Sequence, residues 1–152
     1  WIEVDNMLNI RKIKLEDKKI YLEMVNEFYN SEAVLHSVDE NNFINTFNEL
    51  IKSDVYTECF IIEYHDKIVG YTLVSKTYSQ ESGGMVLLIE EIYINEKFRS
   101  KGIGKEIFDF LKTRYSSYSR VRLEVEISNK KAIKLYEKLG FNELKYIQMI
   151  KE

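Results

Sequence analysis

The chain has 152 residues, enough for one domain with a hydrophobic core and too few for two comfortable ones. Its hydrophobic share of 45% and charged share of 31% are typical of a globular protein, and a net charge of -3 argues against a broad nucleic-acid-binding surface. No apolar run approaches the roughly 18 residues that a bilayer span needs, and no signal-peptide pattern opens the chain, so we expect a cytoplasmic protein without a membrane partner.

The first half of the chain predicts one strand, two helices and a hairpin. Alternating apolar and polar residues over 8–15 indicate the strand, and apolar side chains at helical spacing predict amphipathic helices over 16–30 and 37–53. The second helix opens with Ser37 and Glu40 in capping-box spacing. The hairpin covers 58–79, with a tight turn at Asp66-Lys67. Residues 1–6 are interpreted as a remnant ahead of a native start at Met7.

The second half of the chain alternates strands and helices. The run "MVLLIEEIYIN" (85–95) is apolar on both faces, which indicates a central strand. A helix begins near Gly102, a strand follows over 120–127, a helix with one apolar face over 128–140, and a closing strand over 141–151. This order predicts an α/β fold: a mixed central sheet of about six to seven strands, with four helices on both faces.

The turn between the central strand and its following helix, "EKFRSKGIGKEIF", has the chemistry of a phosphate cradle. The helix N-terminus offers unpaired backbone N–H groups and a partial positive charge, and Gly102 and Gly104 let a bulky anion approach the backbone. Arg99, Lys101 and Lys105 add cationic charge. A dinucleotide fingerprint would need a third glycine at the place of Ile107, and a P-loop would need Ser or Thr at the place of Glu106.

The stretch Arg99-Ser100-Lys101-Gly102-Ile103-Gly104 resembles the Arg/Gln-x-x-Gly-x-Gly/Ala motif of the GNAT superfamily of N-acetyltransferases. The preceding "IEEIYIN" and the later "NKKAIKLYEKLGF" are similar to that family's neighbouring motifs, in the expected order. The resemblance implies one N-acetyltransferase domain over 7–152, in which the central strands 85–94 and 119–126 splay apart for acetyl-CoA. It also implies that residues of the strand and the turn, with Asn129 further on, bind this cofactor: Ile92, Tyr93, Ile94, Arg99, Ser100, Lys101, Gly102, Ile103, Gly104, Lys105 and Asn129.

Three residues are candidates for the chemistry of transfer. Glu90 and Glu91 are neighbours in a strand, so their side chains are expected on opposite faces, and one of them would take the proton from an incoming ammonium group. Glu90 is slightly preferred, but the sequence does not separate the two. By the resemblance, Tyr136 is the general acid for the departing sulfur, although without it a core aromatic is the better interpretation. Asn129 could also be a simple helix cap.

Other residues carry weaker signals. Tyr78, Gln80 and Glu81 precede the central strand and are candidate substrate-binding residues, against a plain solvated loop. His36 and His65 are isolated, so no metal is predicted, and Cys59 is expected to be a buried small hydrophobe.

The sequence therefore predicts an enzyme that acetylates a small-molecule or peptide amine. Three alternatives stay open: a CoA-binding regulatory module without catalysis, an acyltransferase for a longer acyl-CoA, and an interaction domain with a tyrosine-rich face. Free edge strands and exposed aromatic residues are compatible with a homodimer.

Overall fold

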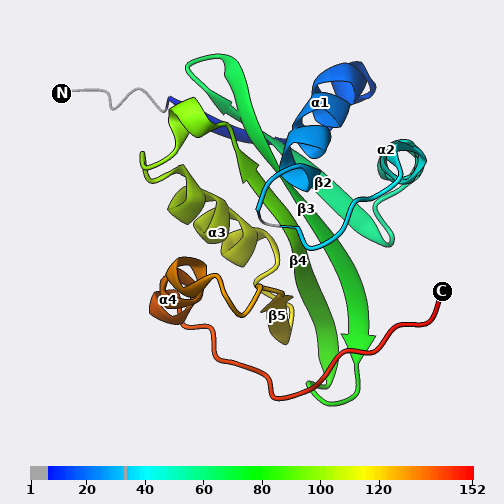
Figure 1. Cartoon of the computed structure of the whole chain (residues 1–152), viewed down its shortest axis with the longest axis vertical. Helices are drawn as coiled ribbons and strands as arrows, with labels where there is room; N and C mark the ends of the chain where they lie inside the picture. Colours follow the sequence, from blue (N-terminus) through cyan, green and yellow to red (C-terminus); the bar gives the residue numbers. More distant parts are fainter. Residues whose placement is uncertain (1–6, 33) are drawn as a thin grey trace.

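The protein is described by a computed structural model that places residues 7–32 and 34–152, so the interpretation of residues 1–6 lies outside the described residues. Within them, one sheet runs in the order β1-β2-β3-β4-β5, with four α-helices around it (Figure 1). The strands are β1 (Leu8–Lys12), β2 (Thr57–Tyr64), β3 (Lys67–Ser79), β4 (Gly84–Ile94) and β5 (Arg120–Leu123). The helices are α1 (Lys18–Tyr29), α2 (Glu40–Lys52), α3 (Ile103–Arg114) and α4 (Lys130–Lys138), with two short 3-10 turns, η1 (Leu15–Asp17) and η2 (Glu96–Phe98).

Helices cover both faces of a mixed sheet, as the sequence predicts. Strands β1 to β4 pair antiparallel in chain order, and β4 pairs parallel with β5. On one face, α1 and α2 contribute Tyr21, Val25 and Phe47 to a core that includes Tyr71. On the other face, α3 buries its apolar stripe of Ile103, Ile107 and Leu111 against β2, β3 and β4.

The predicted count of six to seven strands is wrong for the described residues, where five strands form. The expected closing strand over 141–151 is the missing element, since these residues form no ladder with the sheet. The apolar face of α4 is also less covered than the sequence predicts: none of its residues is buried, and Leu135 is 51% exposed. A strand forms only where a segment pairs with a neighbouring strand, and residues 141–151 pair with none among the described residues, although the outer edge of β5 is free.

Two local predictions also need correction. The side chain of Asp39, rather than Ser37, caps α2 by accepting the Asn41 amide at 2.9 Å. The hairpin turn consists of His65 and Asp66, both with positive φ, so β3 already begins at Lys67. In both cases the capping or turn residue lies one or two positions from the expected one, which is common at element boundaries.

A β-bulge in β4 sets the direction of the side chains that follow it. Leu73 of β3 faces Glu91, whereas the next residue, Val74, faces Ile89, so Glu90 is the extra residue. Before the bulge, Ile89 packs into the α3-side core; after it, Tyr93 packs into the core under α1 and α2. The bulge therefore interrupts the strict alternation on which the prediction for Glu90 and Glu91 relied.

A buried carboxylate, Glu58 of β2, connects the sheet to the end of α3. Its side chain is 2% exposed and accepts hydrogen bonds from Lys76 at 2.8 Å, from Arg114 at 2.9 Å and from the Tyr115 hydroxyl. Burial opposes the charged form, but these three donors together outweigh it and lower the pKa of Glu58 to about 2. Its carboxylate therefore stabilises the fold at neutral pH.

We expect Glu58→Gln to lower the free energy of unfolding at pH 7 by about 3 kcal/mol, because Lys76 and Arg114 lose a buried partner. A lowered folded-state pKa stabilises the protein above the ordinary value of 4.5, and this stabilisation is lost as the pH falls toward 2. Urea unfolding should therefore separate wild type and variant widely at pH 7 and much less at pH 3. The exposed Glu23→Gln is the control, and an equal gap at both pH values would contradict the assignment.

Candidate active site

The free edge of β4 is the first component of the site. The β4–β5 ladder ends at the pair Ile89 and Leu123, although β4 itself continues to Ile94. Beyond Ile89, only β3 pairs with β4 among the described residues. On the β5 side, no described strand pairs with Ile92, Tyr93 and Ile94, so an extended ligand with amide groups could pair with this edge, where the Ile94 carbonyl accepts the Arg99 side chain at 2.8 Å.

The turn that follows β4 has the backbone geometry that an anion cradle requires. Asn95 caps η2, and the chain then takes positive φ at Ser100 (62°) and Gly102 (80°) before α3 begins at Ile103. The N-cap residue of α3 is Gly102, which has no side chain that could accept a hydrogen bond from the first amides of the helix. Positive φ at Ser100 is costly for a residue with a Cβ, and such strain tends to occur at ligand-binding turns.

Gly104 leaves open space at the start of α3. A Cβ built there would have the Ile94 Cδ1 atom at 4.0 Å as its one neighbour within that range among the described residues. The protein therefore does not require glycine at this position for its own packing. A ligand that uses this space gives a physical reason for the missing side chain.

The cations around the turn have different surroundings. The Arg99 Nε atom donates to the Ile94 carbonyl at 2.8 Å, and this side chain lines a pocket with Glu27 and Tyr93 on the α1 side of β4. Lys105 is paired with Asp109 at 2.8 Å on the surface of α3. Lys101 is exposed and has no ion-pair partner among the described residues. The turn thus keeps cationic charge that can meet an anion.

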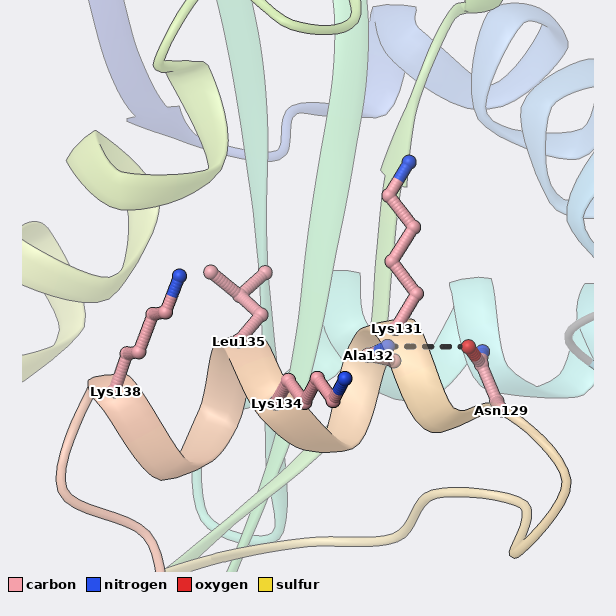
Figure 2. A pocket seen from close by; sticks show the side chains of 6 residues that line it. All are labelled: Asn129, Lys131, Ala132, Lys134, Leu135 and Lys138. Carbon is pink, nitrogen blue, oxygen red and sulfur yellow. Dashed lines mark hydrogen bonds between the residues drawn. The ribbon is translucent and has the colours of Figure 1, made fainter.

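A second cationic surface lies on α4, and its lysines are not among the site residues that the sequence predicts. A pocket of about 530 Å³ is lined by Asn129, Lys131, Ala132, Lys134, Leu135 and Lys138 (Figure 2). The side chain of Asn129 accepts the Ala132 amide at 3.2 Å, so Asn129 caps the helix and borders the pocket at once. The three lysines recur at helical spacing, a signal that was readable in the sequence. The pocket suits a ligand with both apolar and anionic parts.

The bulge places the two carboxylates in different environments. Glu91 is 8% exposed, and its two oxygens accept the hydroxyls of Tyr71 at 2.7 Å and Tyr29 at 2.9 Å. Burial raises the pKa of Glu91, the nearby charge of Glu90 raises it further, and the two hydroxyls act in the opposite direction. Glu90 is exposed and accepts the Ser75 hydroxyl at 2.7 Å. The two tyrosines lie 62 and 20 residues from Glu91, so no sequence pattern connects them to it.

Tyr136 lies between aromatic rings on the inner side of α4. Its ring centroid is 6.0 Å from that of Phe108 on α3 and 6.1 Å from that of Phe141. Burial raises the pKa of the Tyr136 phenol, so this group stays protonated at neutral pH. Among the described residues, its hydroxyl has no protein hydrogen-bond partner, which leaves it able to donate to a ligand.

The predicted substrate-binding residues Tyr78, Gln80 and Glu81 lie at the hairpin between β3 and β4. Tyr78 pairs with Met85, which is five residues before Glu90 in β4 and therefore roughly 17 Å away along the strand. Glu81 forms an ion pair with Arg120 at 3.1 Å. The fold thus does not bring these three residues to the carboxylate pair.

The comparisons with known proteins agree with this geometry. A model of the acetyltransferase (GNAT) family matches residues 19–141, which include the open strand edge, the turn and α4. This chain belongs to the GNAT acetyltransferase family. The glucosamine 6-phosphate N-acetyltransferase of Arabidopsis thaliana is 30% identical over 149 residues, covering 93% of this chain and 94% of the relative. The thialysine N-epsilon-acetyltransferase of Mus musculus is 29% identical, covering 89% of this chain and 84% of the relative.

The GNAT fold is supported by solved structures as well. A possible acetyltransferase from Clostridium difficile 630 superposes with a TM-score of 0.81 at 22% identity, covering 96% of this chain and 97% of that one. No helix in the described residues is long and apolar enough to cross a bilayer. The same residues contain no group of three or more side chains that could hold a metal ion.

Proposed function

We propose that this GNAT acetyltransferase transfers the acetyl group of acetyl-CoA to a primary amine by direct attack in a ternary complex. The observation that carries the proposal is the continuity of the site. The open edge of β4 leads into the uncapped N-terminus of α3, and Gly104 leaves space there. A bare strand edge followed by an anion cradle matches a ligand with an amide-containing arm and a diphosphate.

Three groups of residues are proposed to hold acetyl-CoA. The backbone of Ile92 to Ile94 would pair with the pantetheine arm, and the amides of the turn over 100–105 would bind the diphosphate. The lysine pocket on α4 would add charge for the remaining anionic part, with Asn129 at its border. A strand amide would also donate to the thioester carbonyl, whose oxygen gains negative charge in the transition state.

Two side chains would manage the protons of the reaction. An alkyl ammonium group, with a pKa near 10.4, must lose a proton before it can attack. Glu90 is the better candidate for this step, because it is exposed, whereas both oxygens of Glu91 already accept tyrosine hydroxyls. Tyr136 would donate its phenol proton to the departing sulfur. The amine nitrogen bonds to the acetyl carbon as the carbon–sulfur bond breaks, which leaves an amide and the CoA thiol.

The acceptor is proposed to be a cationic amine. Glu90 and Glu91 lie next to the end of the β4–β5 ladder, and Glu27 lines the pocket with Tyr93 on the α1 side. Their negative charge would attract an ammonium group and orient it. The names of the two relatives support nitrogen as the acceptor atom, although these relatives act on a sugar phosphate and on thialysine.

Glu90→Gln should lower kcat/KM for the amine by at least about 100-fold, because the variant cannot accept a proton. Binding of acetyl-CoA, measured by calorimetry, should stay unchanged, since Glu90 is not part of the cradle. Glu91→Gln is the matched control, because it makes the same substitution at the neighbouring residue, whose carboxylate already accepts hydrogen bonds from two tyrosines. A normal rate for Glu90→Gln together with a large loss for Glu91→Gln would reverse the two roles.

A thiol-release assay over a panel of amines tests the function itself. Release of CoA that depends on an amine supports the proposal, and comparison of acetyl-CoA with longer acyl-CoA donors defines the acyl group. Binding of acetyl-CoA without release by any amine would favour a regulatory module. Absence of heat on titration with acetyl-CoA would remove the proposed function altogether.

A further inference from the structure

Thr72 of β3 carries a buried hydroxyl that has no part in the reaction as proposed so far. The side chain is 0% exposed, and its Oγ1 atom donates to the backbone carbonyl of Glu91 in β4 at 3.0 Å. Valine has nearly the same shape, is equally common in strands and brings no polar atom that must be satisfied in a core. The hydroxyl therefore requires a reason beyond the filling of space, and its partner indicates one.

The hydrogen bond fixes the peptide group between Glu91 and Ile92. In a trans peptide the C=O and N–H groups point in opposite directions, and the described part of the chain contains no cis peptide bond. Because the Glu91 carbonyl accepts Thr72 on the β3 side, the Ile92 N–H points the other way, toward the side of β5. The β4–β5 ladder ends at Ile89, so this N–H faces the open edge where the arm of acetyl-CoA is proposed to lie.

The following residues of β4 show the same alternation. The Tyr93 carbonyl faces β3 so closely that a Cβ at Gly70 would lie 2.1 Å from its oxygen. The Asn95 N–H also points to β3, where it donates to the Val69 carbonyl at 2.7 Å. Backbone groups of alternate residues in a strand point to the same side, so those of Ile92 point to the side opposite from Tyr93 and Asn95.

This peptide group follows directly on the β-bulge of β4. Glu90 is the extra residue of the bulge, and Glu91 is the next residue in the strand. A bulge disrupts the ladder locally, so the ladder alone holds the backbone less firmly at this point. A buried hydroxyl from the neighbouring strand adds a fixed hydrogen bond at the place where the direction of the peptide is least determined.

We propose that Thr72 is a positioning residue of the acetyl transfer: its hydroxyl holds the Ile92 N–H in the direction of the thioester carbonyl oxygen. This inference rests on the proposed function and assigns the oxyanion donor within it. As the amine attacks, that oxygen gains negative charge, and a donor fixed beforehand needs no reorganisation to meet it. The Thr72 hydroxyl, the peptide group and the ligand oxygen form a chain in which each hydrogen bond strengthens the next. Thr72 itself touches no substrate and transfers no proton.

Thr72→Val removes the hydroxyl and should lower kcat about tenfold, with little change in the Kd of acetyl-CoA. Loss of a whole oxyanion donor costs about 100-fold or more, whereas here the donor remains but is no longer held. Thr72→Ser keeps the hydroxyl and should retain most of kcat. If the valine variant does not fold, Thr72→Ala, which also lacks the hydroxyl, takes its place in the comparison.

Thr57→Val is the matched control for stability. The Thr57 hydroxyl donates to the Val74 carbonyl at 2.7 Å, which is the same kind of bond between β2 and β3. Both valine variants should melt about 2–4 °C below wild type, because each loses one hydrogen bond. Only Thr72→Val should lose activity as well, and equal kcat values in the two variants would overturn the proposal.

Infrared difference spectroscopy reports on the hydrogen bond to the thioester. Acetyl-CoA with carbon-13 at the thioester carbonyl is bound without an amine, and its spectrum is subtracted from that of the unlabelled complex. In wild type the carbonyl band should lie at lower frequency than in free acetyl-CoA, because a hydrogen bond to the oxygen weakens the C=O bond. The band should move back toward the free position in Thr72→Val and stay in place in Thr72→Ser and Thr57→Val.

The outcomes distinguish a failure of this inference from a failure of the proposed function. If amine-dependent release of CoA occurs but the band of Thr72→Val stays at the wild-type position, Thr72 is a packing residue, and the inference is wrong while the transferase activity stands. If wild type does not bind acetyl-CoA, or binds it without turnover with any amine, the proposed function fails and the positioning role of Thr72 fails with it.

Discussion

Gly104→Asp should abolish the binding of acetyl-CoA while leaving the fold intact. The new carboxylate would stand in the cradle at the start of α3, where the ligand's diphosphate is proposed to lie. Two unit charges about 4 Å apart near a protein surface repel by about 4 kcal/mol, which corresponds to roughly a thousandfold loss of affinity. Isothermal titration of acetyl-CoA into the variant measures this loss directly.

The stability of the same variant serves as its internal control. The space at Gly104 is open in the protein, with Ile94 Cδ1 at 4.0 Å from the position that a Cβ would take, so an added side chain meets no obstacle. An aspartate in the first turn of a helix interacts favourably with the helix dipole, by about 0.3–1 kcal/mol. The melting temperature should therefore be equal or slightly higher. Gly104→Ala adds bulk without charge and should weaken binding less. Wild-type affinity in Gly104→Asp would show that the diphosphate lies elsewhere.

Tyr136→Phe should lower kcat by about 100-fold or more, with little change in the affinity for acetyl-CoA. The variant keeps the ring that packs near Phe108 and Phe141 and loses the hydroxyl. A phenol with its ordinary pKa near 10 carries its proton throughout the neutral range, and burial raises the pKa of Tyr136 further, so the group is protonated and its hydroxyl can donate to the departing sulfur. Steady-state kinetics with calorimetry separates the effect on kcat from the effect on binding.

A different donor provides a check on the role of Tyr136. If the acyl donor contains a more acidic thiol, its thiolate is a better leaving group and depends less on a donated proton. The difference in kcat between wild type and Tyr136→Phe should therefore be smaller with such a donor. Phe108→Leu perturbs the same aromatic cluster without removing the hydroxyl and should change stability more than chemistry. If Tyr136→Phe turns over at the wild-type rate, Tyr136 is a packing residue, as its helical position alone suggests.

The turn proposed as the cradle could be located from the sequence because its parts are neighbours in the chain. Gly102, Gly104 and the surrounding cations lie within the stretch 99–105, and a strand followed by a helix is enough to place them at a helix N-terminus. The order of elements likewise follows from local periodicity, and the structure reproduces it up to the closing strand. The cationic face of α4 could have been predicted in the same way, since its lysines recur at helical spacing.

Contacts between segments that are far apart in the chain could not be predicted from local sequence patterns. The environment of Glu91 depends on Tyr29 in α1 and Tyr71 in β3, and the separation of Glu90 from Glu91 depends on a bulge in the β3–β4 register. Register arises from the pairing of whole strands, so no single strand's sequence contains it.

The sequence by itself determined the strand–helix order, the glycine-rich basic turn before α3 and the family resemblance, because each depends on short stretches of neighbouring residues. Only the tertiary structure decided which carboxylate is buried, which strand edge is open and whether residues 141–151 pair with anything. Those outcomes depend on which surfaces meet in space. The physical reason is that burial and hydrogen bonding are properties of a residue's neighbours, and folding, not sequence proximity, chooses the neighbours.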